Sequence, residues 1–373
     1  MSVYRSMVFI VLLIAPFRQT LAADNLLIVT LDGLRWQEVF GGPDQQILAS
    51  LESSQRQALE QQFGASADAA SRQKLMPFVW QQVATRGVII GNRPLGSTMQ
   101  VSNDMWFSYP GYNELLTGQA DPNITSNDLN DNANVTILEW LHRQPAYQHK
   151  VAVFGSWDAF GAIINQRRSQ VVVNSGFQSA DWQQLNQQAR WLNELQAAVP
   201  QLWPTVRYDA FTVAMAQAYI SSHQPKVIYL ALGETDDYAH AGNYAEYLRG
   251  AHRDDQLIAR LWQQLQSMPG YRNNTNLLIT VDHGRGQTPQ DWQHHSSSRA
   301  MALHGSPDKG AIVGSDQIWL AAMGPDIEAK GETLKGNYSL SQVAATALHL
   351  LGQSAPQYNP QMGAMLPLFA QSD

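Results

Sequence analysis

The chain contains 373 residues, no cysteine and 15% charged residues, and its formal net charge is −7 at pH 7. This length is sufficient for one large α/β domain, whereas the negative balance and modest charge content argue against a nucleic-acid-binding surface. The absence of cysteine excludes a disulfide scaffold, thiolate metal sites and a cysteine nucleophile.

The first 22 residues have the pattern of a secretory signal peptide. Arg5 supplies a positive charge, the apolar run from Met7 to Pro16 is too short to span a bilayer, and Thr20-Leu21-Ala22 offers small residues for cleavage. We therefore expect residues 1–22 to be removed and residues 23–373 to form a single periplasmic or secreted domain without a membrane span.

The mature part begins with an apolar run, Leu26–Leu31, that leads directly into Asp32-Gly33. This run predicts a strand buried on both faces of a parallel sheet, with the carboxylate at the carboxyl end of the strand. An Asp-Gly pair is also a common turn, so this motif carries little weight alone. Residues 43–75 are rich in Gln, Ala and Ser and predict a helical insertion at the surface.

Ser108 stands two residues before Pro110, where a helix ending at Gly118 is expected to begin. The free N–H groups and the dipole at a helix N-terminus favour an anion. A serine at such a position is most often an N-cap. Beside metal ligands it becomes a candidate nucleophile, because a metal lowers the pKa of the hydroxyl.

Farther along the chain, a helix is expected from Asn134 to His142 and a strand at Val151–Phe154. Residues 177–206 are dense in Gln, Trp and Leu. They predict a second helical insertion, which is a candidate cover for the site.

Lys226–Gly233 predicts another buried strand, and Asp236 and His240 follow it four residues apart. This spacing places both side chains on one face of a helix, where a carboxylate and an imidazole can form half of a zinc site. A solvated acidic loop with a stray histidine is the alternative interpretation. Tyr244–Gln266 then has the apolar periodicity of a long amphipathic helix.

The run Leu277–Val281 repeats the form of the first strand and ends in Asp282-His283-Gly284. The carboxyl ends of parallel strands lie along one edge of a sheet, and ligands bind there. Asp32, Asp236 and the Asp282-His283 pair are therefore expected to share a site. The alternative is that Asp282 caps a helix and His283 faces solvent.

The rest of the chain contains three histidines in a polar loop, a further strand and a final helix. The histidines are His294, His295 and His304, and the predicted strand is Asp316–Pro325. The last helix is expected at Ser341–Leu351, stopped by a glycine.

Five motifs follow one another along the chain, and together they resemble a known superfamily. They are strand-Asp32-Gly33, Ser108-x-Pro with Thr117-Gly118, Asp236-x-x-x-His240, strand-Asp282-His283-Gly284, and His304-Gly305. The series resembles the alkaline phosphatase superfamily, especially its type I phosphodiesterase/nucleotide pyrophosphatase branch, and spans residues 26–351. The resemblance implies a single catalytic domain with a three-layer α/β/α fold and a central, mostly parallel sheet.

The resemblance also implies two metal sites. Asp32, Asp282 and His283 would hold one metal, with Ser108 as the nucleophile beside it. Asp236, His240 and His304 would hold the second. Six nitrogen and oxygen ligands in two sets of three match a catalytic pair of divalent ions, with zinc as the expected metal. His294 and His295 are alternatives to His304, which is preferred because a glycine follows it.

Two departures from the superfamily affect the expected substrate contacts. Phosphodiesterase relatives have an asparagine where this chain has Gly111, so Asn113 or Tyr112 is expected to contact the substrate instead. Tyr112 also stands where sulfatases have an arginine, which argues against sulfatase chemistry and against conversion of Ser108 to formylglycine. The phosphoglycerate mutase branch carries a large inserted domain, for which this chain has little room.

The expected function is therefore an exported two-metal hydrolase of small-molecule phosphate esters, acting through Ser108 and a phosphoseryl intermediate. A phosphomonoesterase, or a phospho- or phosphonate-ester transferase, is the alternative within the superfamily. A non-catalytic exported binding protein on the same fold is the alternative from another class. Retention of all six candidate ligands argues against it.

Overall fold

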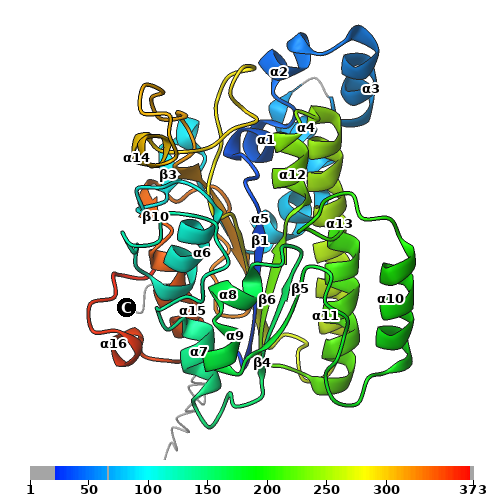
Figure 1. The fold of residues 1–373 in the computed structure, drawn as a ribbon, viewed down its shortest axis with the longest axis vertical. Coiled ribbons are helices and arrows are strands. Elements are labelled where there is room, and N and C mark those ends of the chain that lie inside the picture. The colour runs from blue at the N-terminus through cyan, green and yellow to red at the C-terminus, as the bar shows by residue number, and fades with distance from the viewer. Residues whose placement is uncertain (1–21, 65–66, 370–373) are drawn as a thin grey trace, which may run out of the picture.

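The computed structural model describes residues 22–64 and 67–369, so residues 1–21 of the predicted signal peptide lie outside the described part of the chain. Within this part, seven strands form a central sheet in the order β2-β9-β7-β1-β6-β4-β5. Strand β1 (Asn25–Leu31) lies between β6 (Val227–Leu232) and β7 (Thr275–Thr280) and runs through the centre of the molecule (Figure 1).

The three central strands are parallel and buried along their whole length. Thr30 of β1, for example, pairs with Ala231 of β6 on one side and Thr280 of β7 on the other. Strands β4 (Val151–Gly155) and β5 (Val172–Ser175) continue the sheet in the same direction. The apolar runs therefore form the predicted strands, and their carboxyl ends lie along one edge of the sheet.

The predicted strand Asp316–Pro325 is divided between two sheets. Strand β9 (Leu320–Met323) is antiparallel to both β7 and β2 (Val88–Ile90). Strand β8 (Gln317–Ile318) instead joins β3 (Ser97–Gln100) and β10 (Gly336–Ser339) in a small second sheet. Trp319 between them is buried, and its indole N–H donates to the carbonyl oxygen of Leu34 at 3.0 Å, which anchors the bend.

Helices cover both faces of the central sheet, as the three-layer prediction requires (Figure 1). Helices α11 (Asp209–His223) and α13 (Tyr244–Ser267) lie on one side. Helices α6 (Ser108–Thr117), α7 (Ile137–His142) and α15 (Gln342–Leu350) lie on the other. The short elements are α1 (Trp36–Gly41), a π-helical turn (Val79–Val83), α5 (Ala84–Arg86), a 3₁₀ turn (Arg93–Leu95), α8 (Phe160–Ile163), α9 (Gln166–Ser169), α12 (Glu234–His240), α14 (Ser298–Leu303) and α16 (Ala355–Tyr358).

The two segments predicted as insertions are both helical. Residues 43–75 form α2 (Gln45–Ser50), α3 (Ser53–Phe63) and α4 (Asp68–Leu75), and α4 packs on α1 and α13.

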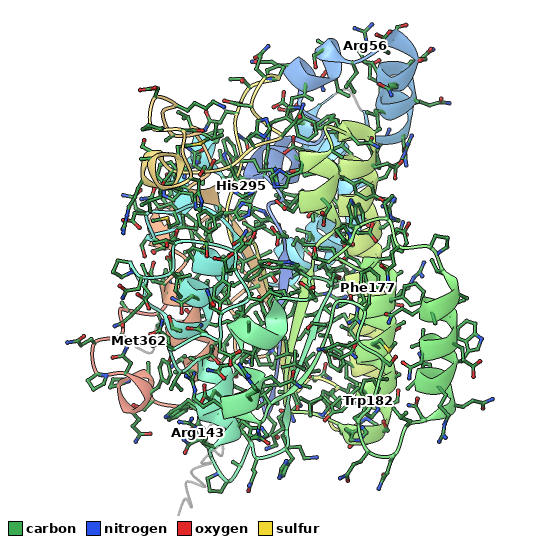
Figure 2. The ribbon with its side chains drawn as sticks, viewed as in Figure 1. Arg56, Arg143, Phe177, Trp182, His295 and Met362 are labelled. Atoms are coloured by element: carbon green, nitrogen blue, oxygen red, sulfur yellow. The ribbon has the colours of Figure 1, made fainter. Side chains whose placement is uncertain are left out.

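Residues 177–206 contain α10 (Gln187–Ala198), which packs on the outside of α11. Figure 2 shows Trp182 of this segment far from His295, which lies near the carboxyl edge of the sheet. Helix α10 therefore does not cover that edge. The end of the segment does approach it, because the Trp203 ring lies 4.9 Å from that of Tyr238 in α12.

Helix α6 packs closely on the carboxyl end of β7. A Cβ atom at Gly111 would lie 2.3 Å from the carbonyl oxygen of Asp282, a distance that real Cβ atoms do not reach. Glycine at this position thus lets the helix approach the sheet. The helix begins at Ser108 and is closed by Gly118 with φ of 73°, as predicted.

In the ranges 22–64 and 67–369, the helices are either too short or too polar to cross a bilayer.

We predict that Gly111→Ala lowers the free energy of unfolding by about 1–3 kcal/mol, because the added methyl group forces α6 away from β7. Urea denaturation measures this change. Gly270→Ala is the matched control: a Cβ at Gly270 meets no atom within 4 Å. It should leave stability unchanged or raise it slightly. Equal stability of the two variants would contradict the close packing of α6.

Candidate active site

The carboxyl ends of β1 and β7 and the first turn of α12 bring three carboxylates together. Asp32 directly follows β1, Asp282 lies two residues beyond the end of β7, and Asp236 lies on the helix that follows β6. Asp32 and Asp282 are buried, and Asp236 is partly buried. The parallel pairing of β1 with β6 and β7 is what places these side chains at one edge of the sheet.

The ring of His283 provides the centre of the arrangement. Its Nε2 atom lies 3.3 Å from Asp32 Oδ1, 3.4 Å from Asp282 Oδ2 and 3.9 Å from Asp236 Oδ1. Its Nδ1 atom donates to the carbonyl oxygen of Gly284 at 2.8 Å, because that oxygen can only accept. This contact holds Nε2 toward the carboxylates, as in metal-binding histidines whose other ring nitrogen is held by a backbone carbonyl.

Ser108, the first residue of α6, points at the same atom. Its Oγ lies 3.3 Å from His283 Nε2, and its side chain is buried. In a serine–histidine–aspartate triad the acid and the serine contact opposite ring nitrogens. Here the serine and the carboxylates gather on one nitrogen, so they surround a single point in space. That pattern is typical of a cation site with an adjacent hydroxyl group.

A second group of candidate ligands lies next to the first. His240 Nε2 is 3.3 Å from Asp236 Oδ2 and 3.0 Å from His295 Nε2, and His295 Nε2 is 3.7 Å from Asp236 Oδ1. Among the residues that the structure describes, two sets therefore have ligand atoms close enough for a metal ion, and Asp236 belongs to both. The sets are Asp32, Asp236 and His283, and Asp236, His240 and His295.

His304 does not join either group, which corrects the predicted ligand set. It is the residue after α14, and its exposed side chain places Nε2 3.0 Å from the carbonyl oxygen of Thr125. His294, the other alternative, is also exposed. His295, the remaining alternative, is the histidine that lies beside Asp236 and His240. The glycine after His304 was a misleading signal.

Tyr112 and Asn113 are not available as the predicted substrate contacts. Tyr112 is buried, and its hydroxyl donates to Asp32 Oδ2 at 2.8 Å, so it orients a candidate ligand. Asn113 is fully buried on α6; its Nδ2 donates to Gln119 O, and its Oδ1 accepts from Asn132 and Asn134. Both positions are one or two residues beyond Gly111, where the helix turns side chains into the protein.

Buried oxygen atoms without hydrogen-bond partners indicate whether these residues could bind metal ions. Asp32 Oδ1 and Asp282 Oδ2 are buried and accept no hydrogen bond from the described residues. Buried oxygens without hydrogen-bond partners are costly, and they are the donors that divalent cations prefer. The residues therefore fit one or two such ions.

Burial and charge determine the protonation of the site. Burial, together with the charge of Asp32, raises the pKa of Asp282 to about 8. Burial alone would lower the pKa of His283, but Asp282 and Asp32 raise it to about 9. Burial and the charge of His283 lower the pKa of both His240 and His295. Without another cation, His283 is thus the charged imidazole that offsets the carboxylates.

Arg285 lies at the site although it belongs to none of the five sequence motifs. Its buried guanidinium group contacts Asp236 Oδ1 through Nη2 and donates through Nη1 to the carbonyl oxygen of Gln293 at 2.7 Å. A Cβ atom at Gly33 would lie 2.7 Å from Arg285 Nε, so the glycine after Asp32 makes room for the guanidinium. The available signal was its position directly after the Asp-His-Gly motif.

Comparison with known proteins agrees with this architecture. The chain is 24% identical over 128 residues to a probable 2,3-bisphosphoglycerate-independent phosphoglycerate mutase of Leptospira interrogans serovar Lai. The match covers 34% of this chain but only 22% of that relative's length.

Solved structures share the fold at low sequence identity. A substituted variant of the alkaline phosphatase PafA has a TM-score of 0.56 at 12% identity, and the match covers 90% of this chain and 99% of that chain. A protein of the alkaline phosphatase superfamily from Vibrio parahaemolyticus has a TM-score of 0.54 at 12% identity, with 92% and 71% covered. The predicted superfamily fold is thus confirmed.

The family itself follows from the sequence between β2 and β9. The model of the family described as type I phosphodiesterase / nucleotide pyrophosphatase matches residues 93–324, more than half of the 373 residues. The matched range includes Ser108, Asp236 and the Asp282-His283 pair. This chain therefore belongs to the type I phosphodiesterase/nucleotide pyrophosphatase family.

Proposed function

We propose that the protein is a metal-dependent hydrolase of small phosphate esters, with Ser108 as the nucleophile. The observation that carries the proposal is the convergence of Ser108 Oγ and three carboxylates on His283 Nε2, at the start of a helix. Family membership supports phosphate-ester chemistry. The geometry supports a hydroxyl nucleophile beside a cation.

Two divalent ions, expected to be zinc, would use the ligands described above. Asp32, Asp282 and His283 would hold the first ion, and Asp236, His240 and His295 the second, with Asp236 near both. When bound, such ions lower the pKa of a neighbouring hydroxyl and stabilise charge on the phosphoryl oxygens. Tyr112 and Arg285 would hold Asp32 and Asp236 in position through the contacts described above.

In the proposed reaction, Ser108 Oγ attacks phosphorus, the bond from phosphorus to the ester oxygen breaks, and the alcohol leaves with a proton. Water then attacks the phosphoseryl intermediate, which restores the hydroxyl group and releases the phosphate product. The N-terminus of α6, where Ser108 lies, favours the negative charge of the transferred group through the helix dipole.

A phosphomonoesterase, or a transferase that passes the phosphoryl group to an alcohol, would use the same residues and is the alternative within the superfamily. A non-catalytic binding protein is less compatible with the site. It has no need for two buried carboxylate oxygens, Asp32 Oδ1 and Asp282 Oδ2, that accept no hydrogen bond from the described residues beside a buried serine.

The metal sites predict the metal content of variants. Purified protein should contain about two divalent ions per chain by elemental analysis. His295→Ala should lose the second ion and most turnover, because His295 supplies one of its three ligands. His304→Ala is the matched control and should retain both ions, since His304 contacts Thr125 instead. Loss of an ion from His304→Ala with retention in His295→Ala would reverse the assignment.

Ser108→Ala should lower turnover of an aryl phosphate mono- or diester by roughly 10³-fold or more while the fold and metal content are kept. The reason is that the substitution removes only a buried hydroxyl group. Steady-state kinetics with 4-nitrophenyl esters measure the loss, and mass spectrometry of quenched wild-type reactions should detect phosphoserine.

Tyr109→Phe is the control, because the hydroxyl of Tyr109 is a nearby competitor that donates to the carbonyl oxygen of Asn130. It should change turnover by a few-fold at most. If Ser108→Ala kept a substantial rate, water would be the direct nucleophile and Ser108 would not be catalytic.

We also propose export to the periplasm or the medium, on the basis of the N-terminal pattern described above. Expression with the full N-terminus in a bacterial host should give a mature protein that begins near Ala23, because signal peptidases cleave after small residues such as Ala22. N-terminal sequencing of the periplasmic fraction measures this. An intact Met1 on a cytoplasmic product would contradict export.

A further inference from the structure

The loop between β3 and α6 contains a strained residue next to the site. Trp106 has φ of 60°, in the left-handed region, which a bulky aromatic residue rarely adopts. Strained backbone of this kind persists only where the surroundings hold it, and it is concentrated at functional sites. Trp106 lies two residues before Ser108, so the strain adjoins the proposed nucleophile.

Two buried polar side chains hold this loop. Glu114 of α6 is fully buried, and its carboxylate accepts hydrogen bonds of 2.8–3.0 Å from the backbone N–H groups of Ser102 and Asn103 and from both of their side chains. Asn103 Oδ1 in turn accepts from the N–H groups of Met105 and Trp106 at 3.1 and 2.9 Å. The backbone N–H groups of residues 102, 103, 105 and 106 are therefore tied to α6, either directly or through Asn103.

The bend aims the Trp106 carbonyl group at the second group of ligands. His295 Nδ1 lies 3.2 Å from Trp106 O and must be the donor, since a carbonyl oxygen only accepts. That hydrogen bond leaves His295 Nε2 unprotonated and directed at Asp236 and His240. The loop that carries His295 is fastened to the same segment, because Ser297 N donates to Met105 O at 3.0 Å.

We propose that Asn103 and Glu114 are positioning residues that fix the position of His295 relative to that of Ser108. Helix α6 carries both Ser108 and Glu114, and the Glu114–Asn103–Trp106 chain of hydrogen bonds extends that helix to the imidazole of His295. The spacing between the nucleophile and the second metal is thereby fixed by the loop instead of by either side chain alone. This inference rests on the proposed function for its catalytic meaning.

Asn103→Ala tests the proposal without touching Ser108, His295 or any other candidate ligand. It removes the acceptor for the Met105 and Trp106 N–H groups and the donor to Glu114. We expect affinity for the second zinc ion to fall about 10–100-fold in competition with a chelator, with affinity for the first unchanged. Asn103→Ser should restore part of the affinity, because a hydroxyl group can accept from N–H groups two or three residues on.

A second readout reports on His295 without any metal. In ¹⁵N NMR spectra of metal-free wild-type protein, His295 should be the Nδ1–H tautomer, and Asn103→Ala should lose that single state. Asn186→Ala is the matched control: Asn186 caps α10, accepting from Ala189 N and donating to Ala218 O, away from the site. It should lower thermal stability similarly and leave both zinc affinities and the His295 tautomer unchanged.

The proposal is overturned if folded Asn103→Ala keeps the wild-type His295 tautomer. If the alanine variant does not fold, the same result for Asn103→Ser overturns it. Where the wild type binds two zinc ions, unchanged affinity for the second ion in these variants overturns it equally. A wild-type protein that shows the Nδ1–H tautomer but binds no zinc and cleaves no ester would count against the proposed function alone.

Discussion

Repulsion among three carboxylates at one edge of the sheet is the constraint on which the site depends. Asp32 and Asp236 place oxygen atoms within 4.8 Å of each other. Two unit charges at that separation repel by roughly 3 kcal/mol at an effective dielectric constant of 20. Asp282 adds a third carboxylate, which is completely buried. A fold that forces these groups together needs positive charge or an added proton among them, and burial beside Asp32 accordingly raises the pKa of Asp282 to about 8.

The sheet prevents these carboxylates from moving apart. Asp32 and Asp282 lie within two residues of the ends of adjacent parallel strands, so neither can move far without disturbing the paired backbone. The protein supplies partial compensation through the protonated ring of His283 and the guanidinium group of Arg285. Even with these two positive groups, Asp32 Oδ1 and Asp282 Oδ2 accept no hydrogen bond from the described part of the chain. Divalent ions would complete the compensation, so their binding energy would add directly to the stability of the fold.

The sequence predicted the parts of the site that depend on local structure. Asp32 and Asp282 were placed correctly because a buried apolar run both forms a strand and marks where that strand ends. Ser108 was placed at a helix start because Pro110 and Gly118 mark the two ends of α6.

Residues that depend on long-range packing were not predictable in the same way. The choice between His295 and His304 lies in a segment without periodicity, where only contacts with the loops at Trp106 and Thr125 decide which ring turns inward. The role of Tyr112 depends on the close approach of α6 to β7, and the division of the last strand depends on the indole of Trp319. None of these contacts has a local sequence pattern.

The two groups of ligands differ in how they are held and in how far the protein encloses them. Asp282 and His283 are fully enclosed, with α6 on one side and the sheet beneath. His240, by contrast, is at the end of α12 with 45% of its side chain exposed, and His295 is on a loop. The more exposed of the two ligand groups therefore lies on the side of His240. That group is also the one whose geometry depends on loops, because His295 is held by the carbonyl oxygen of Trp106, so the exposed side of the site is the side that loop contacts order.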